Sequence, residues 1–397
     1  GGEKWIQLKS GIPTIAVRDI DIQEREEDLV LATFGRGFYI LDDYSPLRTI
    51  DKELTEKEAH MFDIPKAKMY IQKRGMYGQG STYFTGENPE YGAVFTYWMK
   101  ETPKTREQIR RKKEKELFKE GKRIPQLTWK EQREEEQEVS PYLIFTIYDD
   151  EGFVVRKVTK KPSKGVHRIN WDFRYENPYP VRLKNGEFNP YSERGNGILA
   201  MPGTYKVSVE LYHHGEIKEL IPPKEFVAEQ LENRTLPAED RGELLAFQKK
   251  IADITRAIQG ADELSANMMK KMKTIKQAIL NTPAETKELM SEAERIQDEL
   301  DEVIFAFHGV TPRASSEEIP PHEMTIMERL SAITWAHYRS TSKVTETERT
   351  NYEILKKDFP PLLEKLKKLK KEDIQKLEDK LEELNAPWTP GRMPKFE

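Results

Sequence analysis

The sequence predicts an α+β protein of several domains, because short strands fill its first part and helical repeats fill the rest. Up to about residue 230, apolar and polar residues alternate in short runs that are separated by turn residues. From Pro237 onward, apolar residues recur every third or fourth position, which is typical of amphipathic helices. At ~100–200 residues per domain, a chain of 397 residues holds two or three domains.

The composition favours a folded protein with highly charged helices. Charged residues make up 34%, but 65 Lys and Arg nearly balance 69 Asp and Glu, so the net charge is only -4. This balance argues against nucleic-acid binding, which needs a basic excess. We expect no transmembrane segment, because no apolar run approaches the ~20 residues that span a bilayer. The chain has no cysteine, which excludes disulfides and thiolate metal sites. No signal peptide is visible in the first residues.

Residues 1–50 predict three or four short strands joined by tight turns. The apolar run 29–34 and the run 38–41 are separated by Gly35-Arg36-Gly37. Glycine allows the positive φ angles that such a tight turn requires. A sheet this small is only marginally stable in water. We therefore expect it to complete a larger structure.

Residues 51–230 predict a β-sandwich-like domain of immunoglobulin or fibronectin type, from the spacing of its short strands. Within the first part of this range, we expect a short helix from Leu54 to Phe62. The strongly charged stretch 103–138 interrupts the strands and predicts an insertion of two helices, or of one helix and a loop. The insertion is either a solvated hairpin or an arm that docks a partner, and the sequence leaves both open.

Residues 231–397 predict a helical bundle followed by a C-terminal tail. Thr282-Pro283 marks one helix start, because proline is favoured at the first helical position. The expected helices cover about 244–258, 264–279, 289–307, 324–338, 350–370 and 371–384.

Several segments resemble a known family. Gly1-Gly2-Glu3-Lys4-Trp5 resembles the end of an Asp-box (BNR) repeat. The stretch 17–43, with Ala32-Thr33-Phe34-Gly35-Arg36, resembles the last blade of sortilin-like, BNR-type β-propeller proteins, a family often grouped with glycosyl hydrolases. That family usually has His where Phe34 stands, so any role of the imidazole is absent here. Segments 170–174, 201–205 and 386–392 resemble the domain and the tail that follow the propeller.

The resemblance implies that residues 1–50 are the terminal blade strands of a β-propeller. It also implies that the remaining blades lie outside this chain, in another chain or in a part that has been removed. Members of the family are extracytoplasmic, so the implied location is the periplasm, the cell surface or the medium. The implied partners are the remaining blades, or a chain that carries them, and a protein complex at the cell surface or outer membrane.

Arg36 is the one candidate ligand-binding residue, because it projects from a tight turn and could meet an anionic ligand. The alternative is a purely structural role in the turn. Asp42-Asp43 could bind Ca²⁺ or cap the next turn. A glycosidase needs two carboxylates at a set distance, and 69 acidic residues do not single out a pair. We therefore expect no catalytic residue, no metal site and no cofactor in this chain.

The histidines and tryptophans do not define a metal-binding or sugar-binding site either. None of the seven histidines has the His-Glu-x-x-His spacing of a zinc helix. His213-His214, next to Gly215, are expected to be exposed at a hairpin tip or to bind a metal. Some tryptophans could stack on sugars or pack in a core, namely Trp98, Trp129, Trp171, Trp335 and Trp388.

The resulting functional hypothesis is a non-catalytic part that braces the propeller or docks a protein partner at the cell surface. The alternative is an accessory part of a secreted hydrolase of glycans or peptides, whose active site lies on the missing blades. No catalytic constellation is present in the sequence, so it leaves open whether the intact protein is an enzyme.

Overall fold

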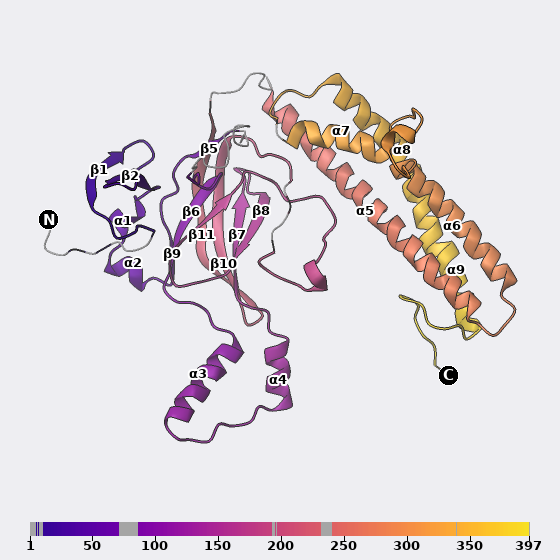
Figure 1. The fold of residues 1–397 in the computed structure, drawn as a ribbon, viewed down its shortest axis with the longest axis horizontal. Helices are drawn as coiled ribbons and strands as arrows, with labels where there is room; N and C mark the ends of the chain where they lie inside the picture. The colour runs from indigo at the N-terminus through magenta and orange to yellow at the C-terminus, as the bar shows by residue number, and fades with distance from the viewer. Residues whose placement is uncertain are drawn as a thin grey trace. The chain divides into compact units, whose positions relative to one another are not determined.

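The computed structural model describes residues 5, 7, 11–70, 86–192, 195, 197–231, 240–338 and 340–396. The fold is mixed α+β, as the sequence predicts, and it divides into two compact units (Figure 1). The first unit holds residues 1–174, 189–193 and 202–232, and the second holds residues 175–188, 194–201 and 233–397. The described strands belong to the first unit, and the long helices after residue 240 belong to the second.

The first three strands form a separate antiparallel sheet, which we call the N-terminal sheet. They are β1 (Val17–Gln23), β2 (Asp28–Thr33) and β3 (Phe38–Leu41), in the order β1-β2-β3. Gly35 and Gly37 in the β2–β3 turn have φ angles of 76° and 72°, which confirms the prediction for this turn. Two short helices follow, α1 (Pro46–Thr49) and α2 (Lys52–Glu56).

Two further sheets build the body of the first unit. Their strands are β4 (Ala59–Met61), β5 (Ala67–Met69), β6 (Ala93–Met99), β7 (Tyr142–Tyr148), β8 (Val154–Lys160), β9 (Gly165–Trp171), β10 (Gly203–His213) and β11 (Glu216–Gln230). The five-stranded sheet has the order β5-β11-β10-β7-β8 and curls into half a barrel. The three-stranded sheet has the order β4-β6-β9. Strand β5 joins β11 in parallel, and the other pairs are antiparallel.

An aromatic core joins these two sheets. Phe95 of β6 meets Phe226 of β11, with ring centroids 5.2 Å apart. Trp171 of β9 is fully buried, and its ring lies 4.9 Å from that of Tyr205 on β10. Aromatic side chains bury large apolar areas, and this burial is the main force that holds two sheets together.

The helix predicted from Leu54 to Phe62 is wrong in its second half. Only Lys52–Glu56 is helical, and Ala59–Met61 pairs with β6. Strand pairing here also buries Met61, which is 2% exposed. Sheet pairing and burial therefore override the local helical pattern, which is a common outcome for short segments.

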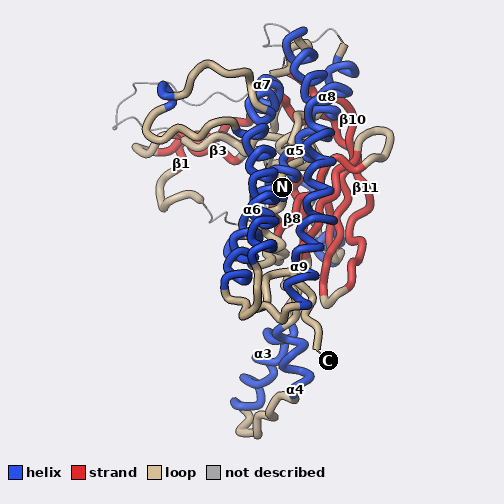
Figure 2. Tube along the Cα trace, turned by 90° about the vertical axis from the view of Figure 1, so that its right-hand side faces the viewer, coloured by secondary structure: helices blue, strands red, loops and turns tan. Residues whose placement is uncertain are grey.

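The charged stretch 103–138 forms two helices between β6 and β7, which is one of the two alternatives that the sequence left open. They are α3 (Arg106–Lys119) and α4 (Trp129–Glu136), and neither buries a residue. Each begins with a capping box, in which the side chain of a threonine and that of the residue three positions later satisfy exposed amide groups. Both views show the two helices projecting from the sheets (Figures 1 and 2). We call residues 103–138 the helical arm.

The long helices of the second unit share one hydrophobic core. These are α5 (Arg241–Leu280), α6 (Lys287–His308), α7 (Ile326–Tyr338), α8 (Glu346–Lys368) and α9 (Ile374–Glu383). A π-helical turn, Leu369–Asp373, links α8 to α9. Helix α6 returns along α5 (Figure 1), and both contribute to the core.

Helix α5 is one helix of 40 residues, where the sequence predicts two. Gly260 lies between the two predicted helices and stays helical. A glycine in a helix interior costs only about 1 kcal/mol relative to alanine. Ile258 and Ala261, on either side of it, are buried in the same core. The burial on both sides therefore keeps the helix continuous.

The C-terminal segment is held against the end of α9 by Arg392, which is 7% exposed. Its Nη2 donates hydrogen bonds to the carbonyl oxygens of Ala386 at 2.6 Å and Pro387 at 2.9 Å. Its Nε lies 2.8 Å from Glu382 Oε2, forming an ion pair. Trp388 Nε1 donates to the carbonyl oxygen of Arg392 at 2.6 Å. These contacts give residues 386–392 a structural role.

Candidate functional site

One face of the N-terminal sheet is formed by Val30, Ala32, Phe38 and Ile40. The β2–β3 register places Ala32 opposite Phe38 and Val30 opposite Ile40. Directly opposed residues in a sheet point to the same side. Phe38 is 74% exposed and Ile40 is 60% exposed.

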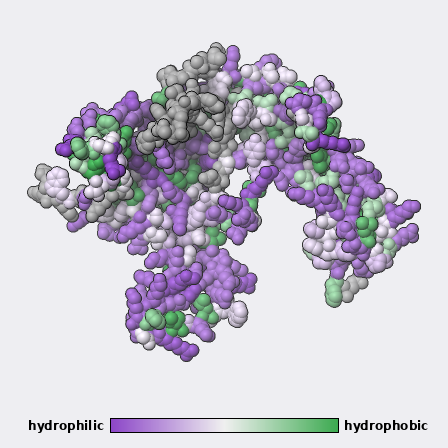
Figure 3. All heavy atoms as spheres, in the orientation of Figure 1, coloured by the Kyte–Doolittle hydropathy of each residue, from purple (hydrophilic) through white to green (hydrophobic). Residues whose placement is uncertain are grey.

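The opposite face carries Ile20, Ile22, Leu29 and Leu31. Ile20 lies opposite Leu31, and Ile22 lies opposite Leu29. Ile20 and Ile22 are exposed, whereas Leu31 is buried. Hydrophobic side chains are visible over this sheet in Figure 3. An antiparallel sheet that faces water usually does so with one polar face, whereas this sheet exposes apolar side chains on both faces.

Arg36, the predicted ligand-binding residue, lies exposed in the β2–β3 turn. The turn is fixed by Thr33, whose N and Oγ1 donate to the carbonyl oxygen of Gly37 at 3.1 Å and 2.7 Å. Phe34 is 67% exposed, and the Arg18 guanidinium lies 4.9 Å from its ring centroid. In the described parts of the chain, these turn contacts do not involve the Arg36 side chain.

The chain that leaves β3 is attached to the body of the first unit. Arg168 of β9 donates from Nη2 to the carbonyl oxygens of Asp42 at 2.6 Å and Asp43 at 2.7 Å. Asp43 Oδ1 accepts hydrogen bonds from Ser45 N at 3.2 Å and Ser45 Oγ at 2.5 Å. Asp28 Oδ1 accepts from Asp43 N at 3.0 Å. Asp43 therefore supports the turn that begins α1, in agreement with the capping alternative.

Asp42 gives this junction a pH dependence. Burial, and then the charge of Asp28, raise the pKa of Asp42, while Arg168 acts in the opposite direction. The folded state therefore holds this proton more tightly than the unfolded state, and stability falls as the pH rises from about 3.8 through the raised pKa. We expect Asp42→Asn to raise the melting temperature slightly at pH 7 and to change it little at pH 3. Calorimetry at both pH values checks this, and equal shifts would contradict an electrostatic cause.

His213 and His214 lie at the tip of the β10–β11 hairpin, but they are not an exposed pair. His213 Nε2 lies 2.9 Å from the carbonyl oxygen of Lys104, and His214 Nδ1 lies 2.6 Å from Glu138 Oε1. Both partners belong to the base of the helical arm. The two histidines therefore attach the arm to the hairpin. Sequence spacing could not reveal this contact, because Glu138 is 76 positions from His214.

The tryptophans considered as sugar platforms are distributed over both units. Trp171 is fully buried in the aromatic core of the first unit. The others lie on different elements and are exposed to different degrees, namely Trp98, Trp129, Trp335 and Trp388. Of the two predicted roles, sugar stacking or core packing, core packing is confirmed for Trp171.

Within the described ranges, no group of three or more histidine and acidic side chains is placed to hold a metal ion. The described helices include none with the length and apolar character needed to cross a bilayer. Comparison with known proteins finds no matching family model, no similar curated protein and no similar solved structure.

Proposed function

We propose that the N-terminal sheet docks onto the remaining blades of a β-propeller, and that this chain is the non-catalytic C-terminal part of a sortilin-like, BNR-repeat protein. The observation that carries this proposal is the exposure of apolar side chains on both faces of the sheet. Propeller blades stack around a central axis, so a blade buries both faces against its neighbours. A three-stranded sheet is only marginally stable alone, so docking onto neighbouring blades would also stabilise it.

The remainder of the chain braces the propeller in this proposal. The hydrogen bonds from Arg168 to the chain after β3 support such a role, because they fix the sheet to the body of the first unit. The two packed sheets then correspond to an immunoglobulin- or fibronectin-like domain, and the helices of the second unit to a bundle. The resemblance of residues 17–43 supports an extracytoplasmic location and a partner complex at the cell surface.

The first test replaces the exposed residues of one sheet face. We expect Phe38→Ser/Ile40→Ser to weaken binding to a separately produced chain that carries the other blades. Each side chain contributes about 1.5–3 kcal/mol when fully buried, so the double variant is expected to lose about 100-fold or more in affinity. Calorimetric titration with the wild-type chain and the variant measures this loss.

A matched control is Val181→Ser/Leu183→Ser, which removes two apolar side chains that are 89% and 52% exposed outside the strands. This variant is expected to bind as the wild type does. Equal affinity of all three proteins would show that the Phe38 side of the sheet is not the docking surface. Far-UV circular dichroism confirms that each variant is folded.

A second candidate function is an accessory part of a secreted hydrolase of glycans or peptides. The exposed Arg36 favours it, because a guanidinium binds carboxylate and phosphate groups well. Turnover of a glycan and peptide panel by the intact protein, but not by this chain alone, would support this role. Turnover by this chain alone would contradict the non-catalytic assignment.

A further inference from the structure

The far end of the helical arm carries four exposed apolar side chains. Phe118 lies in the last turn of α3 and is 76% exposed, and Trp129 begins α4 and is 88% exposed. Ile124 and Leu127 lie in the connecting loop and are 40% and 37% exposed. Figure 3 shows hydrophobic atoms gathered at this end of an otherwise hydrophilic arm. We call these four residues the apolar tip.

Basic side chains surround the apolar tip. From residue 115 to 130, five lysines and arginines stand against two glutamates, a net charge of +3 in a chain whose total is -4. Lys122 pairs with Glu120 at 2.7 Å. Lys119 and Arg123 make no ion pair with a carboxylate in the described parts of the chain. The tip therefore offers apolar and cationic groups together.

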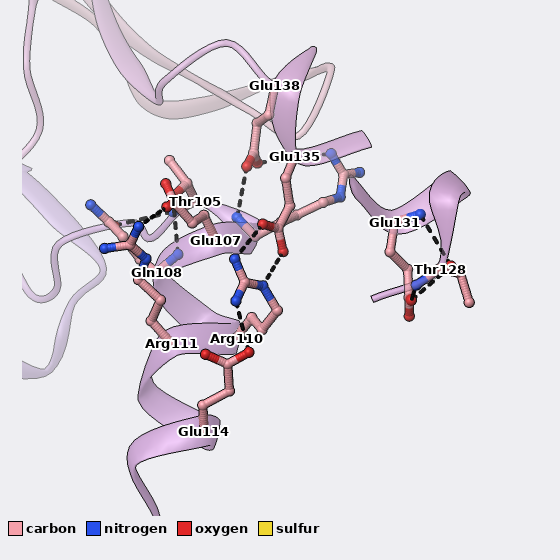
Figure 4. A network of polar contacts seen from close by, with 11 residues as sticks. Thr105, Glu107, Gln108, Arg110, Arg111, Glu114, Thr128, Glu131, Glu135 and Glu138 are labelled. Carbon is pink, nitrogen blue, oxygen red and sulfur yellow. Dashed lines mark hydrogen bonds and ion pairs between the residues drawn. The ribbon is translucent and has the colours of Figure 1, made fainter. Parts of the chain in front are cut away.

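Polar contacts connect the two helices of the arm and its base (Figure 4). Arg110 of α3 donates from Nε and Nη2 to the two carboxylate oxygens of Glu135 on α4, at 2.7 Å and 2.8 Å. The same guanidinium donates to Glu114 at 2.7 Å. At the base, Glu138 accepts from the backbone N of Arg106 at 2.7 Å and contacts His214. The acidic side chains near the base therefore already have partners, within the arm or in the β10–β11 hairpin.

We propose that the helical arm binds the surface of an anionic lipid bilayer through the apolar tip. Tryptophan and phenylalanine favour the boundary between headgroups and acyl chains. Lysine and arginine next to them are attracted to anionic headgroups. The tip is a projecting loop, which can enter a soft lipid layer without a preformed pocket. This geometry and charge favour a bilayer over a protein partner.

Flotation of the full chain with lipid vesicles tests this. We expect binding to vesicles of phosphatidylcholine with phosphatidylglycerol, little binding to phosphatidylcholine alone, and weaker binding as salt is raised. Phe118→Ser/Trp129→Ser is expected to reduce binding by more than about 100-fold. Lys119→Gln/Arg123→Gln is expected to reduce it by about 25-fold, at about fivefold per charge.

Matched controls remove the same kinds of side chain elsewhere. Phe305→Ser/Val310→Ser replaces exposed apolar residues, and Lys270→Gln/Lys273→Gln replaces exposed lysines of α5. Both are expected to bind vesicles as the wild type does, and hydrogen exchange in α3 and α4 shows whether the arm stays folded. Absent binding to anionic vesicles would overturn the proposal, as would binding that both tip variants retain. Tip-dependent capture of a protein without vesicle binding would replace it with protein docking.

Discussion

Trp171→Ala is expected to destabilise the first unit by about 3–5 kcal/mol, the usual cost of removing a buried tryptophan. Trp171 is fully buried, and its ring centroid lies 4.9 Å from Tyr205 and 5.4 Å from Phe173. Its Nε1 also donates to the carbonyl oxygen of Arg174 at 2.9 Å. The substitution leaves a cavity between the two sheets and removes this donor.

Urea unfolding, with hydrogen exchange in β6 and β9 as the local readout, measures the loss. The control is Trp129→Ala in the same unit, because Trp129 is 88% exposed and a surface substitution changes stability by only about 0.5 kcal/mol. Equal stability of the two variants would mean that the aromatic core does not hold the sheets together. Since Arg168 lies on the same strand as Trp171, loss of β9 is also expected to release the proposed docking sheet.

Arg392→Ala is expected to destabilise the second unit by about 3–5 kcal/mol, because breaking a buried ion pair leaves its partner uncompensated. The side chains of Arg392 and Glu382 are 5% and 14% exposed. The substitution also removes the donor to the carbonyl oxygens of Ala386 and Pro387. The segment after α9 then has no guanidinium to hold it.

Protection of α9 and of residues 386–392 against hydrogen exchange, together with urea unfolding, measures this effect. Arg392→Lys is expected to fall between the wild type and Arg392→Ala, because lysine keeps the charge but lacks the planar fork of donors. Arg313→Ala serves as the control, since Arg313 is exposed in a loop. If Arg392→Ala proves as stable as Arg313→Ala, the C-terminal segment is not an anchored part of the fold.

Local chemistry explains what the sequence determined by itself. The residue pattern was enough to locate the change from strands to helices and the tight turn at Gly35 and Gly37. It also located the charged insertion at 103–138, although it left open whether this insertion held two helices or one helix and a loop. Each of these features depends on residues close together in the chain, so one sequence contains the necessary information.

Only the tertiary structure decided which distant groups meet and which surfaces stay uncovered. It pairs His214 with Glu138, buries Arg392 against Glu382, turns Ala59–Met61 into a strand and keeps α5 continuous through Gly260. It also shows that apolar side chains are exposed on both faces of the N-terminal sheet and at the apolar tip. These outcomes depend on burial and on contacts between residues far apart in the chain, which local pattern does not encode.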